Sequence, residues 1–201
     1  MRVDLHLHTA ERSFCASSAA IDQLTVARGQ GLDAVAITDH HALVSSAERA
    51  VLAAQVPGLI LIPGIEITLD HEAEDILVLG LDDRELETRD WDWSSLRAFV
   101  RERGGTTILA HPYRYAPTVG LDLADEPPDA IEGHSSNVDP DDHARIRRLA
   151  ADHALPLVAN SDAHSTRAIG RYANRLDEPA STAAEILAAI RTGRFTPEHP
   201  A

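Results

Sequence analysis

The sequence lacks several features that mark whole classes of protein. It contains no lysine, and all 18 of its basic residues are arginine. A single cysteine, Cys15, excludes a framework of intrachain disulfides and is compatible with a reducing compartment. No apolar run approaches the roughly 18 residues that a membrane helix requires, and the first residues do not resemble a secretory leader. We therefore expect a cytoplasmic protein without a membrane partner.

Charge and aromatic content limit the possible partners. The formal net charge is -14, and the chain has only two tryptophans, three tyrosines and three phenylalanines. An acidic chain without a broad basic surface is a poor ligand for duplex nucleic acid, and few aromatic rings are available to stack a long single strand. A small anionic substrate remains possible, because bound divalent cations would reverse the local charge. The oligomeric state is left open.

Strand-length apolar runs alternate with helix-period segments along the whole chain. This alternation predicts an α/β fold with a mostly parallel sheet, in a single domain over residues 1–201. About seven strands in a chain shorter than the usual length of an eight-stranded barrel favour a distorted seven-stranded (β/α)7 TIM-like barrel. A doubly wound open sheet is the alternative, because periodicity does not report whether a sheet closes.

Polar residues of a few types recur where the predicted strands end. They are His6, His8, Asp39, His40, His41, Glu66, His111, Glu132, His134, Asp162 and His164. Because the carboxyl ends of parallel strands open on one face, these side chains are expected to converge there. A lone buried histidine is more often a hydrogen-bonded core residue, but recurrence on five strand ends is hard to produce by packing alone.

The stretch "DLHLH" shows what this convergence implies. Side chains alternate along a strand, so Asp4, His6 and His8 point to one face. Imidazole and carboxylate ligands together suit Zn, Mn or Fe, and the strand ends carry enough donors for two or three divalent ions. Elsewhere, His71, His143, His153 and His199 fit a solvated surface better.

These segments resemble the PHP (polymerase and histidinol phosphatase) superfamily of metal-dependent phosphoesterases. The segments that carry the resemblance are "DLHLHT", "LDAVAITDHH", "GIEIT", "ILVLGL", "ILAHPYR", "AIE", "LPLVANSDAH" and "STRAIG". The resemblance implies a distorted (β/α)7 barrel of PHP type that holds two or three divalent ions. It further implies the metal ligands His6, His8, His40, Glu66, His111, Asp162 and His164, with Glu66 bridging two ions. Asp39 would orient a neighbouring histidine.

Three positions depart from the usual pattern of the superfamily. Where many members carry an aspartate after the first motif, this chain has "AERSFCASS", so Glu11 or Cys15 is the substitute or the ligand is missing. Asp75 occupies a position that is often histidine, with His71 as the alternative. His134 stands where the ligand type varies, so the number of ions stays open.

The resulting hypothesis is a hydrolase in which a metal-activated hydroxide attacks a small phosphate ester, nucleotide-like or histidinol-phosphate-like. Arg114 is the first candidate to hold the phosphoryl group, Arg167 the second and Arg12 a weaker third. His134 is a candidate to protonate the leaving oxygen, with Glu132 as its partner or as a structural acid. The alternatives are a non-catalytic or regulatory PHP module and an exonuclease acting on oligonucleotide ends. Metal-dependent amide hydrolysis is disfavoured, because it would prefer a metal-bridging lysine.

Overall fold

A computed structural model describes residues 1–200 of the chain. Ala201, which the predicted single domain includes, lies outside the described residues. The strands are β1 (Arg2–Asp4), β2 (Ala34–Ala36), β3 (Ile60–Ile62), β4 (Gly64–Leu69), β5 (Glu74–Leu79), β6 (Thr106–Leu109), β7 (Ala130–His134), β8 (Leu157–Ala159), β9 (Ala173–Leu176) and β10 (Phe195–Glu198). The helices are α1 (Ala20–Gly29), α2 (Ser46–Gln55), α3 (Glu85–Thr88), α4 (Trp93–Glu102), the 3₁₀ helix η1 (Pro140–Asp142), α5 (His143–Asp152) and α6 (Ala183–Arg191).

The strands form two mixed sheets of five strands each. Their orders are β10-β9-β1-β2-β3 and β4-β5-β6-β7-β8. Parallel pairing joins β1 to β2, β2 to β3, β6 to β7 and β7 to β8, whereas β4, β5 and β6 are antiparallel neighbours, as are β1, β9 and β10. The predicted distorted seven-stranded (β/α)7 TIM-like barrel is therefore wrong, since residues 1–200 contain no closed barrel.

The barrel prediction failed for two physical reasons. The hairpin of β4 and β5 turns the chain back within a few residues, so the parallel succession is interrupted. The sequence did not predict strands β9 and β10; β9 pairs antiparallel with β1, and β10 pairs antiparallel with β9 at the edge of the sheet. They are short, and β10 contains Pro197, so their composition carries little strand signal.

The two sheets meet at single bridges instead of a continuous ladder. Leu7 pairs with Ala163 at one seam, and His40 pairs with Glu66 at the other. Gly64 permits the close approach at the second seam, because a Cβ atom there would lie 2.9 Å from the carbonyl oxygen of Ile37. Both seams carry residues that were predicted to bind metal.

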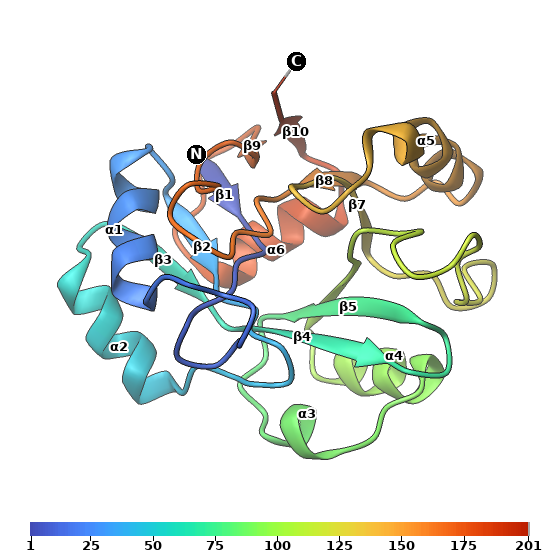
Figure 1. The fold of residues 1–201 in the computed structure, drawn as a ribbon, viewed down its shortest axis with the longest axis horizontal. Coiled ribbons are helices and arrows are strands. Elements are labelled where there is room, and N and C mark those ends of the chain that lie inside the picture. Colours follow the sequence, from blue (N-terminus) through green and yellow to red (C-terminus); the bar gives the residue numbers. More distant parts are fainter. Residues whose placement is uncertain (201) are drawn as a thin grey trace.

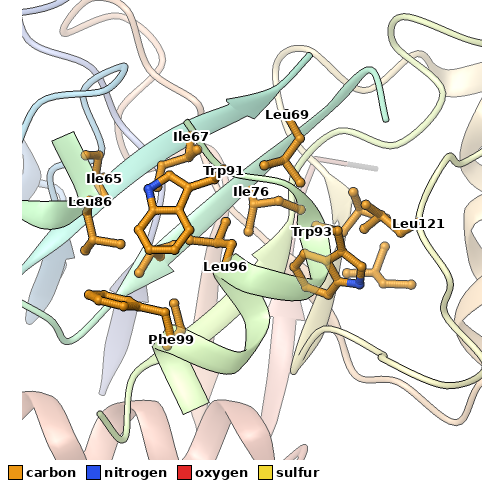
Figure 2. Close-up of a cluster of buried hydrophobic side chains, with 14 of the residues drawn as sticks. Ile65, Ile67, Leu69, Ile76, Leu86, Trp91, Trp93, Leu96, Phe99 and Leu121 are labelled. Carbon is orange, nitrogen blue, oxygen red and sulfur yellow. The ribbon is translucent and has the colours of Figure 1, made fainter. Parts of the chain in front are cut away.

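Helices cover the outer faces of the sheets. Helices α1 and α2 lie on the side of β1–β3, whereas α3 and α4 lie against β4 and β5 (Figure 1). Figure 2 shows the hydrophobic core between α4 and the β4–β5 hairpin, in which Trp91 and Phe99 pack under Ile67 of β4. The ring centroids of Trp91 and Phe99 are 4.9 Å apart. Burying such aromatic side chains stabilises the hairpin that carries Glu66.

Helix ends follow local sequence signals. Asp92 caps α4 by accepting from the Ser95 N–H, and Asp139 caps η1 directly ahead of Pro140. Thr182 and Glu185 form a reciprocal capping box on α6. Among the described residues, no helix is both long and apolar enough to cross a membrane.

Candidate metal centre

A buried group of histidines and carboxylates lies where the two sheets meet. It contains every residue that was predicted as a metal ligand: His6, His8, His40, Glu66, Asp75, His111, Asp162 and His164. Four sets of three can place one ligand atom each within 4.8 Å of the others. We call these eight residues the buried cluster.

Glu66 on β4 occupies the centre of the buried cluster. Its Oε1 lies 3.1 Å from His111 Nε2 and 3.4 Å from His6 Nε2. Its Oε2 lies 3.2 Å from His8 Nε2 and 3.0 Å from His40 Nδ1. Both sheets therefore deliver imidazoles to the same fully buried carboxylate.

Asp162 is the second shared carboxylate. Its Oδ1 lies 3.3 Å from His6 Nε2 and 3.2 Å from His8 Nε2. Its Oδ2 accepts a hydrogen bond of 2.6 Å from the Asn137 side chain. Asn137 was missed at the sequence level, because it lies in an irregular loop after β7 and belongs to no metal-ligand pattern.

The backbone is unusual at several of these residues. His41, His111 and Asp162 have positive φ angles of 51°, 24° and 47°. Such angles are uncommon outside glycine, although His, Asp and Asn tolerate them better than most residues. Backbone strain of this kind is often found at functional sites, and here it turns His111 and Asp162 inward after their strands end.

Opposite charges control the protonation of the buried cluster. Burial lowers the pKa of His6, but Asp162, Glu66 and Glu132 outweigh it and raise this pKa well above its usual value. Burial raises the pKa of Glu66, but His6 and the hydrogen bond from His111 hold it well below its usual value. Glu66 and Asp162, whose pKa is, despite burial, likewise held below its usual value by His6 and His8, thus stay ionised and attract positive charge.

The donor set fits divalent cations. The buried oxygens Glu66 Oε2, Asp75 Oδ1 and Asp162 Oδ1 have no hydrogen-bond donor within the described part of the chain. The Nε2 atoms of His6 and His8 face each other at 3.1 Å. Buried lone pairs that converge without donors are energetically costly unless cations or protons neutralise them. A mixture of imidazole and carboxylate ligands suits Zn, Mn or Fe.

Two carboxylates support the histidines from behind. Glu132 Oε1 accepts from the ring of His6 over 3.1 Å, so Glu132 is placed beside His6 and not beside His134. Asp39 accepts from Ser13 Oγ at 2.7 Å, and Ser13 Oγ lies 3.3 Å from His8 Nδ1. The predicted orienting role of Asp39 therefore has a route through Ser13.

The structure separates the candidates for the uncertain ligand. Asp75 belongs to the buried cluster with Glu66 and His111, and Tyr115 donates a 2.8 Å hydrogen bond to it. Glu11 instead accepts from the Ala20 N–H at the start of α1, and Cys15 is exposed. His71 lies in a groove of about 400 Å³ beside Trp91.

Only one of the residues predicted to handle the phosphoryl or leaving group lies at the buried cluster. Arg114 lies at the edge of the buried cluster, with its Nη1 3.8 Å from Asp162. Arg167 is exposed in the turn after His164, and Arg12 pairs with Glu48. His134 stacks on His199 at 3.7 Å instead of joining the cluster.

A β-bulge explains the position of His134. Alternation would put Glu132 and His134 on one face of β7. The register shifts between them, because Glu132 pairs with Val158 while His134 pairs with the next residue, Ala159. The extra residue, Gly133, turns His134 away from His6. Sequence alone offers no clear signal for this bulge beyond the glycine.

Comparisons with known proteins bear on the fold. The sequence model of the PHP-associated family, PHP_C, matches residues 140–195. PsfC from Pseudomonas syringae PB-5123 is 21% identical, with a TM-score of 0.74 over 100% of this chain and 91% of PsfC. A two-domain protein from Bacteroides vulgatus ATCC 8482, containing a predicted PHP-like metal-dependent phosphoesterase, is 17% identical with a TM-score of 0.73 over 99% of this chain and 64% of that one. An amidohydrolase from Chromobacterium violaceum is 16% identical with a TM-score of 0.64, over 96% and 97% of the two chains.

No curated protein matches the sequence. The fold and the buried cluster define an α/β protein with a histidine and carboxylate centre at the junction of two sheets. The family match over residues 140–195 and the shared fold support the predicted resemblance to the PHP superfamily.

Proposed function

We propose that this protein is a divalent-metal-dependent phosphoesterase that hydrolyses a small phosphate ester. The observation that carries the proposal is Glu66, which is fully buried and has imidazole nitrogens from both sheets around its two oxygens. With imidazoles around both of its oxygens, Glu66 would hold divalent cations together with these histidines.

The chain's own residues divide into adjacent ligand sets. His6, His8 and Glu66 form one set, and Glu66, Asp75 and His111 form another. Two or three ions of Mn, Zn or Fe match this mixture of nitrogen and oxygen donors. When bound, such ions lower the pKa of a coordinated water and neutralise charge on a phosphoryl group.

Arg114 is placed to orient the phosphoryl group. Its side chain is 36% exposed and lies over the Tyr115 ring, 5.4 Å from the ring centroid, at the edge of the cluster. A planar guanidinium donates two parallel hydrogen bonds to phosphate oxygens and stays charged at any physiological pH. Arg114 can therefore bind the substrate and stabilise charge that develops in the transition state.

The cluster is accessible from one side. The side chains of His40 and His164 are 36% and 27% exposed, whereas those of His6 and Glu66 are fully buried. The groove near Trp91 is lined by His41, which follows His40, and by Thr68, which lies two residues from Glu66 on β4. A groove of about 400 Å³ suits the leaving group of a small ester, nucleotide-like or histidinol-phosphate-like.

The proposal is tested by measuring metal content and turnover together. Wild-type protein should retain transition metal and hydrolyse p-nitrophenyl phosphate with Mn. His8→Ala and Asp162→Asn should lose both properties, whereas the control His153→Ala, at the end of α5, should keep them. Full activity after metal removal would contradict the proposal. Bound metal without turnover across a panel of phosphate esters would instead favour a non-catalytic module.

A further inference from the structure

Asn160 lies outside the buried cluster but is connected to it by hydrogen bonds. It follows β8 directly, and its side chain is fully buried. Its Oδ1 accepts from the Leu5 N–H at 3.2 Å and from Asn174 Nδ2 at 3.1 Å. Its Nδ2 donates to Glu132 Oε1 at 2.9 Å. Because Oδ1 faces two donors, the orientation of this amide is determined by its surroundings.

Asn174 holds this orientation from the other sheet. It lies on β9, and its own amide pairs with Ala159 of β8, accepting from the backbone N–H at 3.0 Å and donating to the carbonyl at 2.9 Å. The side chain thus makes the pair of hydrogen bonds that a neighbouring strand would make. Asn174 therefore connects the sheets where no continuous ladder does, and its second amide hydrogen reaches Asn160.

Glu132 receives three donors in this arrangement. Its Oε1 accepts from Asn160 and faces His6 Nδ1, and its Oε2 accepts from the His111 N–H at 3.1 Å. Three donors from three different segments hold the Glu132 carboxylate in one orientation. Because Glu132 Oε1 holds the Nδ1 side of the His6 ring, His6 Nε2 is directed at Glu66 and Asp162.

We infer that Asn160 is a positioning residue: its amide, oriented by Asn174, holds Glu132 so that His6 presents Nε2 to the buried cluster. The inference rests on the proposed function in taking His6 as a metal ligand. Among residues 1–200, Asn160 makes no hydrogen bond to a predicted ligand side chain, so its effect passes through Glu132.

The discriminating variant is Asn160→Asp, which keeps the shape but replaces the donor to Glu132 with an oxygen. Two carboxyl oxygens would then face each other without a donor between them, and their repulsion would move Glu132 away from His6 Nδ1. Asp129→Asn is the matched control, because Asp129 is a part-buried acid that binds Arg97 and Thr107 elsewhere in the second sheet.

The test measures Zn²⁺ and Mn²⁺ affinity of metal-stripped proteins by calorimetry, and the His6 tautomer by ¹⁵N NMR. Asn160→Asp should weaken metal binding about 10- to 100-fold and shift the His6 signals from the Nδ1–H form, the range expected for loss of a supporting partner. Asp129→Asn should change neither. Wild-type affinity with an unchanged tautomer in folded Asn160→Asp would overturn the inference.

Two further outcomes remain distinguishable. If Asn160→Asp does not fold, the ¹⁵N NMR spectrum of Zn-loaded wild-type protein decides. A proton on His6 Nδ1 would support the inference. A proton on His6 Nε2 would overturn it. If wild-type protein binds no metal, the proposed function fails. Loss of the hydrogen bond between His6 Nδ1–H and Glu132 in Asn160→Asp but not in wild-type protein, measured by NMR, would still support the role of Asn160, and an unchanged hydrogen bond would overturn it.

Discussion

The protein contains two groups of neighbouring histidines with opposite electrostatics. In the buried cluster, carboxylates raise the pKa values of His6, His8 and His111 despite their burial. The second group, which we call the terminal histidine stack, consists of His134, His143 and His199. There, burial and the charges of His199 and His143 lower the pKa of His134 to about 4.

The difference shows what makes a histidine group a candidate metal centre. Ring contacts alone do not separate the groups, since His8 and His40 stack at 4.4 Å while His134 and His199 stack at 3.7 Å. The buried cluster has carboxylates among its rings, and the terminal histidine stack forms no ion pair among residues 1–200. Carboxylate partners therefore define the site better than histidine density does.

The largest effect is expected from a substitution of Glu66, the central carboxylate of the buried cluster. Glu66→Gln keeps the shape of the side chain but removes the charge that attracts cations, so metal affinity and kcat should each fall at least about 100-fold, more than for loss of a supporting residue. Calorimetry and phosphate-ester hydrolysis measure the two quantities. A Glu66→Gln protein with wild-type affinity would show that the central carboxylate is not a ligand.

Metal addition should stabilise the protein through the buried cluster alone. Zn²⁺ or Mn²⁺ at 100 times its Kd should raise the free energy of unfolding by about 2.7 kcal/mol, or the melting temperature by about 5 to 10 °C. Differential scanning calorimetry of metal-stripped protein measures the shift. Glu66→Gln should lose it and His143→Gln should retain it. Equal shifts in both variants would mean that the stabilising ion binds elsewhere.

Arg114 tests whether the open side of the cluster receives phosphate. Arg114→Gln removes a charge-assisted contact, so kcat/KM for a phosphate ester should fall about 10- to 100-fold while metal affinity stays unchanged. Arg114→Lys should recover part of the loss, because a point charge remains. An equal loss of metal affinity would indicate that Arg114 acts through Asp162 instead.

The smallest effect is expected at the terminal histidine stack, in acid. His134 has its pKa lowered from 6.5 to about 4, so between these values the unfolded chain binds a proton that the folded chain does not. Stability should therefore decrease as pH falls from 6.5 to 4. His143→Gln removes a neighbouring charge and should flatten this decrease, as urea unfolding at several pH values would show. A steeper decrease would contradict the assigned cause.

Much of the site could be predicted because its residues follow apolar runs. His6, Glu66 and His111 each come after or within a segment whose strand character is evident, and the structure brings all three together. The positions of Glu11 and His134 could not be predicted in this way. The Glu11 carboxylate accepts from the Ala20 N–H at the start of α1, nine residues along the chain. The bulge that rotates His134 away depends on pairing with β8, which is distant in sequence.

The sequence by itself determined the alternation of strands and helices, the acidic balance and the strand-end residues that can bind cations. These properties depend on local periodicity and composition. Only the tertiary structure decided that the sheets stay separate, that Asp75 and not His71 faces Glu66, and that Asn160 and Asn174 connect the seam. Strand pairing and side-chain hydrogen bonds between distant segments depend on which elements become neighbours, which local periodicity does not record.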